Sequence, residues 1–370
     1  MTEIINLIQK PGILISENGN LPLSKSEIQD LRYKPLTQEV LARIKSGLTC
    51  DFIAVASDLA KFSLAHGQVE RLVSHLIENG AKTELELLEM GSKELYTIAK
   101  DVLGPLWAAY VHTVLTSGIG GETYLFAARD ATPMAFVAEG ILKVNSGQYC
   151  LEGSRIVHVD WNRWFMGQED EMEGSTKPIN LSDPNLKQFY TQMGFGNEKL
   201  VKIIEPGAWG SAANALKITM PEQPFELWFM FSHMPDRIYG FLNTWLPDID
   251  PKYFEIINDT AEAVPKAYVR PTTLSNKEGT IVADLTGKTL ESPYIRAWSM
   301  AVNKGAMEAG IEFGKGKRVD VRNHVVDIIM RSDRAKYGDW TAVLPINTLT
   351  WTEGKKWKED WKWGKIPPLK

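Results

Sequence analysis

The chain has 370 residues, of which 44% are hydrophobic and 24% charged, and this ordinary composition excludes a largely disordered protein. Its net charge of −5 excludes a protein that coats nucleic acid with its whole surface, although it allows a local basic patch. The chain has only two cysteines and an N-terminus without an export signal, which predicts a cytoplasmic protein. It contains no apolar run of about 18 residues, so we expect no membrane span.

The first hundred residues show helical periodicity. Apolar residues recur at spacings of three and four in the segments 36–47, 51–67, 68–80 and 92–104. The first three segments end at a glycine, as helices often do, and the fourth runs into Gly104-Pro105. We therefore expect an N-terminal helical region over residues 1–102.

After a helix over 105–121, strand candidates alternate with helices. The expected strands are 123–130, 154–164, 200–205 and 225–233, and the expected helices are 132–144, 183–195 and 236–246. This alternation predicts an α/β fold, a mostly parallel sheet covered by helices on both faces, in a domain over residues 103–320. Ligands of such sheets bind beyond the carboxyl ends of the strands, so the loops that follow the strands form the candidate site.

The last hundred residues are less regular. Two shorter strands are expected at 266–271 and 279–290, and a long helix over 292–314 has Pro293 in its first turn. Within the second of these strand candidates, the segment 284–288 is interpreted as a hairpin turn, with a ligand loop as the alternative. Residues 321–370 form a C-terminal extension that ends in a tail rich in Trp and Lys.

The loop after the third strand has the composition of a phosphate-binding loop. Glycines let backbone N–H groups approach an anion, and the dipole of the following helix favours negative charge at its start. The strongest nucleotide-binding spacings, GxGxxG and GxxxxGK[ST], are absent, and a tight corner with a packed Trp209 is the alternative. The loop consists of Glu205, Pro206, Gly207, Ala208, Trp209, Gly210 and Ser211.

Arg129 and Asp130 follow the first strand of this domain. An Arg grips phosphate or carboxylate through two hydrogen bonds, and an Asp accepts a proton, holds a sugar hydroxyl or binds a cation. A salt bridge that fixes the turn is the alternative for this pair.

The ends of two further strands carry polar residues. Asp160 and Arg163 lie where the second strand would end, and His233 ends the fourth. The segment 166–178 is acidic and contains glycines, so it is either a lid or a solvated loop.

These segments, taken in chain order, resemble a known domain. "LGPLWAAYVHTVLTSGIGGETYLFAARDATPM", "EGSRIVHVDWNR", "KLVKIIEPGAWGSAANAL" and "AWSMAVNKGAMEAGIEF" are similar to a bacterial and phage domain with the motifs "LARDG", "SR" and "DVGWxGSxQ". That domain accompanies haloacid-dehalogenase-like domains in proteins linked to surface-polysaccharide biosynthesis. The similarity covers roughly residues 103–313, but Ala131 replaces the family glycine and Glu205-Pro206 replaces the family aspartate.

More distantly, the order of the loops resembles type I phosphoribosyltransferases. That resemblance implies that Arg129-Asp130 lies near diphosphate, that 166–178 is a flexible loop, and that Glu205 to Ser211 holds a ribose 5-phosphate. The family has two adjacent acids where this chain has Glu205-Pro206.

Three functions remain open. The first is a phosphoribosyltransferase-like enzyme for a phosphorylated sugar or nucleotide, with Asp130, Asp160 and Glu205 as catalytic carboxylates and Glu205 as a Mg²⁺ ligand. The phosphate-binding residues would be Arg129, Arg163, Gly207, Ala208, Trp209, Gly210, Ser211 and His233. The second is a nucleic-acid binding or base-modification protein, in which Trp357, Lys358, Trp361 and Lys362 of the tail bind a strand. The third is a non-catalytic interaction protein on this fold, which the changes at Ala131 and Pro206 favour.

Overall fold

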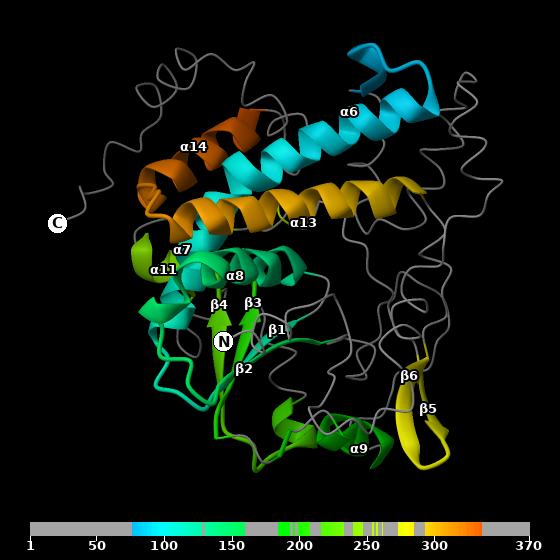
Figure 1. The fold of residues 1–370 in the computed structure, drawn as a ribbon, viewed down its shortest axis with the longest axis vertical. Helices are drawn as coiled ribbons and strands as arrows, with labels where there is room; N and C mark the ends of the chain where they lie inside the picture. Colours follow the sequence, from blue (N-terminus) through cyan, green and yellow to red (C-terminus); the bar gives the residue numbers. More distant parts are fainter. Residues whose placement is uncertain are drawn as a thin grey trace.

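A four-stranded parallel sheet lies at the centre of the computed structural model. The structure describes residues 76–127, 130–159, 184–192, 195–196, 199–207, 216–232, 240–246, 254, 257, 261, 273–284 and 293–334. The strands are β1 (Thr123–Ala127), β2 (Arg155–Val159), β3 (Val201–Glu205) and β4 (Phe225–Phe229), in the order β2-β1-β3-β4 (Figure 1). All three pairings are parallel, so the predicted α/β fold with a parallel sheet is confirmed.

Each face of this sheet packs against an apolar core, and side chains alternate between the two faces along each strand. Tyr124, Phe126 and Ile204 belong to one apolar core, whereas Leu125 and Ile203 belong to another. Strands buried on both faces are continuous apolar runs rather than alternating ones. This explains why the sequence identifies them so readily.

Helices pack on both faces of the sheet and complete the two apolar cores. α7 (Gly104–Thr116) and α8 (Thr132–Asn145) share the first core, to which Val111 and Val137 contribute, and α9 (Pro184–Gln192) shares the second through Leu186 and Phe189. Pro133 in the first turn of α8 has no N–H that would need a partner there, which favours the helix start. The expected helices over 132–144 and 183–195 therefore form.

A long helix stacks on α8. α13 (Pro293–Gly314) lies between α8 and α6 (Glu84–Thr97), as Figure 1 shows, and α14 (Val321–Arg334) follows it. α8 and α13 approach closely because each has a glycine at the contact. A Cβ on Gly140 would collide with the carbonyl oxygen of Met307, and a Cβ on Gly310 would collide with that of Val137.

The helix before the sheet is longer than expected. A capping box starts α6, since the hydroxyl of Thr83 accepts from the Glu86 N–H at 3.2 Å while the Glu86 carboxylate accepts from the Thr83 N–H at 3.0 Å. A π-helix, η1 (Ile98–Leu103), then joins α6 to α7. The expected helices over 92–104 and 105–121 are continuous through η1, because Gly104 keeps helical dihedrals and Pro105 occupies the first turn of α7.

A β-hairpin, separate from the main sheet, packs against α9. β5 (Thr273–Lys277) and β6 (Thr280–Asp284) are antiparallel and turn at Glu278-Gly279, where both φ angles are positive. The side chain of Gln192 in α9 accepts from the Ile281 N–H at 2.9 Å and donates to the Ile281 carbonyl at 3.1 Å. The turn thus lies before the predicted segment 284–288, of which residues 285–288 are outside the described residues. Two further short elements are η2 (Ser146–Gln148) and α11 (Phe241–Trp245).

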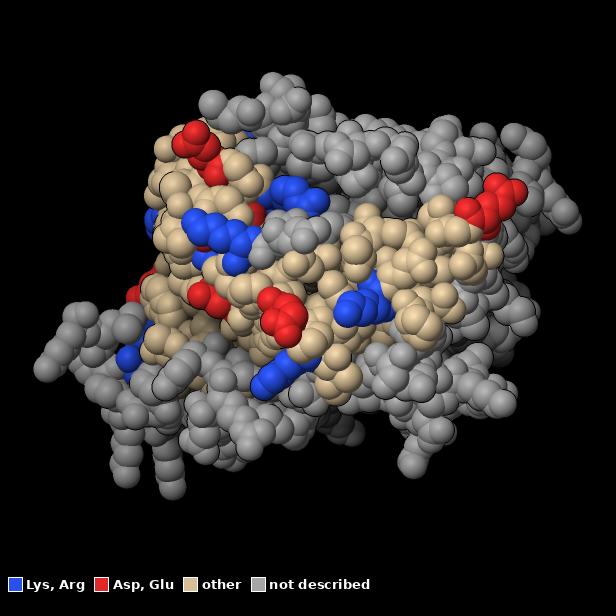
Figure 2. Space-filling view, turned by 90° about the horizontal axis from the view of Figure 1, so that it is seen from below, with Lys and Arg blue, Asp and Glu red and all other residues tan. Residues whose placement is uncertain are grey.

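The described surface is mixed in charge. On the face seen in Figure 2, basic and acidic side chains are interspersed among uncharged ones, without a continuous basic patch among the residues described there. Of the helices in the described part of the chain, none is both long and apolar enough to cross a membrane.

Candidate functional site

The chain leaves the neighbouring strands β1 and β3 toward opposite faces of the sheet. Phe126 of β1 lies opposite Ile204 of β3, so the two strands end side by side. After β1 the chain forms α8 in the first core, whereas Leu216 and Met220, which come after β3, lie in the second core. Such a reversal between adjacent parallel strands opens a crevice at their carboxyl ends, the place where ligands of this class of sheet bind.

Asp130 lies at this edge, immediately before α8. The Ala131 N–H donates to the carbonyl of Ala127 at 3.0 Å, which holds the described part of the turn close to the end of β1. The positive end of the α8 dipole faces the same edge. Ala131 has a φ of −88°, a value that any residue adopts, so its place does not require the glycine of the resembling domain.

Glu205 is the last residue of β3 and its side chain is half-buried. Its carbonyl accepts from the Met230 N–H at 3.2 Å. The Tyr110 hydroxyl of α7 lies 3.3 Å from the same carbonyl and 2.5 Å from the carbonyl of Trp228, so its one hydrogen is shared between these two neighbouring strands. Burial, and after it the charge of Glu205, raises the pKa of Tyr110 well above its ordinary value, so Tyr110 stays a neutral donor. Glu205 is therefore fixed through its backbone, at the same edge as Asp130.

Gly207 packs tightly against the neighbouring strand. A Cβ at this position would lie 2.8 Å from Cε1 of Phe231 and 3.0 Å from its carbonyl oxygen. The backbone pairing of β3 with β4 continues to this point, since the Phe231 N–H donates to the Pro206 carbonyl at 3.3 Å. The close approach to Phe231 is sufficient reason for a glycine at 207, as the tight-corner interpretation of this loop expects.

Several predicted site residues lie outside the described residues, so the structure does not place them. Of the predicted catalytic and phosphate-binding set, the structure brings together Asp130, Glu205 and Gly207 at one edge of the sheet. Those outside the described residues are Arg129, Asp160, Arg163, Ala208, Trp209, Gly210, Ser211 and His233, together with the tail residues Trp357, Lys358, Trp361 and Lys362.

The described residues contain no group of three or more His, Cys, Asp or Glu side chains placed to hold a metal ion. Mg²⁺ commonly binds one or two protein carboxylates and completes its shell with water and substrate phosphates. A single carboxylate at Glu205 is compatible with that pattern. The predicted Mg²⁺ site therefore stays a prediction.

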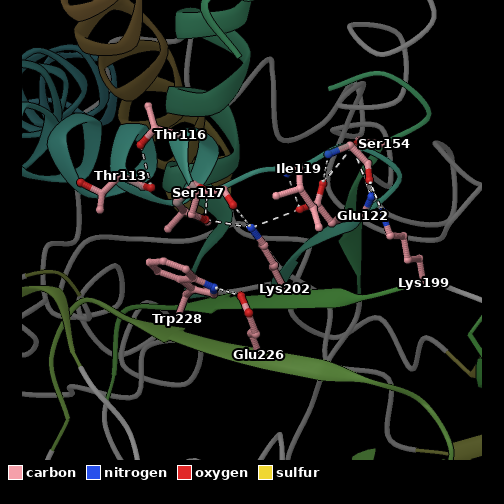
Figure 3. Close-up of polar contacts among 12 residues, drawn as sticks. Thr113, Thr116, Ser117, Ile119, Glu122, Ser154, Lys199, Lys202, Glu226 and Trp228 are labelled. Atoms are coloured by element: carbon pink, nitrogen blue, oxygen red, sulfur yellow. Dashed lines mark hydrogen bonds and ion pairs between the residues drawn. The ribbon is translucent and has the colours of Figure 1, made fainter. Parts of the chain in front are cut away.

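The opposite edge of the sheet contains a buried lysine that the sequence gives little reason to single out. Lys202 of β3 is 2% exposed, and its ammonium group lies 2.8 Å from the hydroxyl and 2.9 Å from the carbonyl of Ser117 (Figure 3). It also lies 3.4 Å from a carboxylate oxygen of Glu122. The rings of Tyr124 and Trp228 flank it, with centroids 5.4 and 5.8 Å away. All three ammonium hydrogens have acceptors within reach.

Glu122, the partner of this lysine, is also fully satisfied. Its carboxylate accepts from the N–H groups of Ile119 and Gly120, both at 2.8 Å, and lies 3.4 Å from the Ser154 hydroxyl. Burial raises the pKa of Glu122, but these backbone N–H groups and the Lys202 charge outweigh burial and hold that pKa below its ordinary value. The network fixes the turn before β1 to strand β3.

Two side chains that support the carboxyl edge are not predicted from the sequence. They are Tyr110 of α7 and Asn243 of α11, whose amide binds the backbone of Ser232 after β4. The sequence shows only that a hydroxyl or an amide occurs within an otherwise apolar helix. It does not indicate which backbone group that side chain contacts. The resemblance to the phage and polysaccharide-associated domain remains a prediction. No family model matches this chain, and a search of curated proteins finds no significant match.

Proposed function

We propose that the carboxyl edge of β1 and β3 binds a phosphorylated sugar or nucleotide and that the protein is a phosphoribosyltransferase-like enzyme. The observation that carries this proposal is the position of Asp130 and of Glu205 to Gly207 at the point where the chain leaves adjacent strands in opposite directions. Oxygen and N–H groups at such a point suit a ligand with both hydroxyl and phosphate groups.

In the proposed reaction the bond between C1 of the ribose and a diphosphate oxygen breaks, and diphosphate leaves with the electron pair. An acceptor nucleophile forms the new bond to C1 and gives its proton to a carboxylate, for which Asp130 and Asp160 are the candidates. Glu205 would hold ribose hydroxyls or a Mg²⁺ ion, which, when bound, partly neutralises the diphosphate. Catalysis of this kind rests mainly on positioning and on electrostatic stabilisation of the leaving group.

Titration calorimetry of the full chain tests this proposal. The probes are phosphoribosyl diphosphate with Mg²⁺, nucleoside monophosphates and inorganic diphosphate. We expect Glu205→Gln and Asp130→Asn each to weaken binding of at least one probe by about tenfold, the equivalent of about 1.4 kcal/mol for a lost charge-assisted contact.

Glu152→Gln is the matched control. It removes the same charge from an exposed residue in the turn before β2, at the amino edge of the sheet, and should leave binding unchanged. Absence of heat from every probe would reject the proposed function. Equal weakening by Glu152→Gln would move any binding site away from the carboxyl edge.

A further inference from the structure

The loop after β4 is held by a side-chain amide of α11. The Ser232 N–H donates to Oδ1 of Asn243 at 3.1 Å, and Nδ2 of Asn243 donates to the Ser232 carbonyl at 2.8 Å. One side chain thus binds both backbone groups of the same residue, as a neighbouring strand would. Ser232 is fully buried, so loss of the amide would leave backbone groups away from water without these bonds.

The same segment is fixed from a second side by main-chain contacts. The Leu242 N–H donates to the Met230 carbonyl at 2.6 Å, and Phe229 forms a parallel bridge with Gly240. A Cβ on Gly240 would lie 2.5 Å from Cα of Phe231. The start of α11 and the end of β4 therefore form one closely packed unit.

Phe231 transmits the position of this unit to the candidate site. The residue is 1% exposed and lies between Gly207, Gly240 and the ring of Phe254, whose centroid is 6.0 Å from its own. Because Gly207 has no side chain, its backbone rests directly on the Phe231 ring. A shift of residues 231 and 232 must therefore move Gly207, or open a gap beneath it.

We infer that Asn243 is a positioning residue for the carboxyl-edge site, which it serves by holding Ser232 and Phe231 and, through them, Gly207. This inference rests on the proposed function for its consequence in ligand binding. Its structural part, the coupling from Asn243 to Gly207, stands on the contacts alone. Binding sites tolerate displacements of only about 0.5 Å, so a small movement of Gly207 is enough to weaken a phosphate ligand.

An experiment can observe Gly207 directly. The sequence contains only two Pro–Gly pairs, Pro11-Gly12 and Pro206-Gly207. Protein labelled with ¹³C-carbonyl proline and ¹⁵N-glycine therefore gives two selected amide signals, and Gly12→Ala shows which of them belongs to Gly207. We expect this signal to shift in Asn243→Ala, which lacks both hydrogen bonds, and in Asn243→Asp, whose carboxylate cannot donate to the Ser232 carbonyl.

Gln223→Glu is the matched control, because Gln223 is a similar amide clamp at the amino edge. Its Oε1 accepts from the Gly196 N–H at 2.8 Å and its Nε2 donates to the Pro224 carbonyl at 2.9 Å. This variant should lower the melting temperature in the same way as Asn243→Asp, yet leave the Gly207 signal and ligand binding as in the unmodified protein.

Calorimetry with phosphoribosyl diphosphate separates the two proposals. Binding that weakens by about tenfold in both Asn243 variants, and not in Gln223→Glu, supports the positioning role. An unmoved Gly207 signal in Asn243→Ala, or binding that all three variants weaken equally, overturns it. A shifted signal in a protein that binds no phosphate probe supports the coupling and rejects the proposed function.

Discussion

At the scale of single residues, the buried pair of Lys202 and Glu122 makes the clearest energetic prediction. An ion pair withdrawn from water contributes little net stability, but removal of one partner leaves an uncompensated charge. Lys202→Met should therefore lower the free energy of unfolding by about 3 kcal/mol at neutral pH, as measured by urea denaturation. Lys199→Met is the control, because Lys199 is exposed and its ammonium group donates to the Gly120 carbonyl at 3.3 Å. If Lys202→Met changed the free energy of unfolding as little as Lys199→Met does, the prediction would be wrong.

The same substitution should show a defined pH dependence. The pKa of Glu122 is lowered in the folded protein, so its contribution to stability is present above its ordinary value of 4.5 and is lost as the pH falls through the lowered value. In Lys202→Met the unpaired Glu122 carboxylate is also protonated as the pH falls, and protonation removes its uncompensated charge. The stability difference between the two proteins should therefore shrink below pH 4.5.

At the scale of elements, the contact between α8 and α13 depends on glycines that helix propensity alone would disfavour. Gly310→Ala improves helix propensity by about 1 kcal/mol but places a methyl group against the Val137 carbonyl. The collision should dominate, and the free energy of unfolding should fall by about 2 kcal/mol.

Gly147→Ala is the matched control, because a Cβ there meets nothing within 4 Å and its φ is not positive. Its effect should stay within about 0.5 kcal/mol in the same denaturation assay. A Gly310→Ala protein as stable as the unmodified one would show that the two helices separate without cost.

The elements that the sequence predicts best are those with local signals. The apolar run "VKIIE" forms β3 as expected, and Pro293 begins α13 as expected. The strand over 123–130 was drawn too long, because β1 ends at Ala127, and polar Asp130 belongs to the turn. The capping box at Thr83 and Glu86 was a readable signal for the start of α6 that the sequence analysis overlooked.

Other features depend on contacts between distant residues and carry no local signal. The π-helix η1 packs closely against α13, since a Cβ on Gly305 would lie 3.1 Å from the Cβ of Ala99 and 3.1 Å from the backbone N of Lys100, and this contact joins residues two hundred positions apart. Asn243 meets Ser232 only because α11 folds back on β4. For the candidate site, the order of strands and loops predicts the carboxyl edge of the sheet as the place to look. The side chains that support this edge are identified only from the three-dimensional structure.

At the scale of the whole molecule, the helices before the sheet and the first face of the sheet share one core. Leu95 and Ile98 pack in the same cluster as Phe126 and Ile204, and α13 contacts α6, η1, α7 and α8. The described part of the predicted N-terminal helical region is thus held to the sheet by burial of apolar surface rather than by a linker.

The distribution of charge over the whole chain indicates where nucleic acid, the second predicted partner, would bind. Residues 351–370 contain six lysines and three acidic residues, a net charge of +3, which leaves −8 on the rest of the chain. The net negative charge of the rest of the chain disfavours DNA there, so we expect binding to come from the tail. Single-stranded DNA should therefore bind the full chain in a salt-dependent way, and a chain that ends at Thr350 should lose that binding.

Two tail variants separate charge from stacking. Lys358→Gln with Lys362→Gln should reduce the slope of log K against log salt by about 1.4, because each phosphate contact to a single strand contributes about 0.7. Trp357→Ala with Trp361→Ala should instead weaken binding at every salt concentration and leave the slope unchanged, since stacking releases no counterions. Undiminished binding by the shortened chain would place the interface elsewhere. Loss of DNA binding with unchanged heat from phosphoribosyl diphosphate would show that the tail and the carboxyl edge serve different ligands.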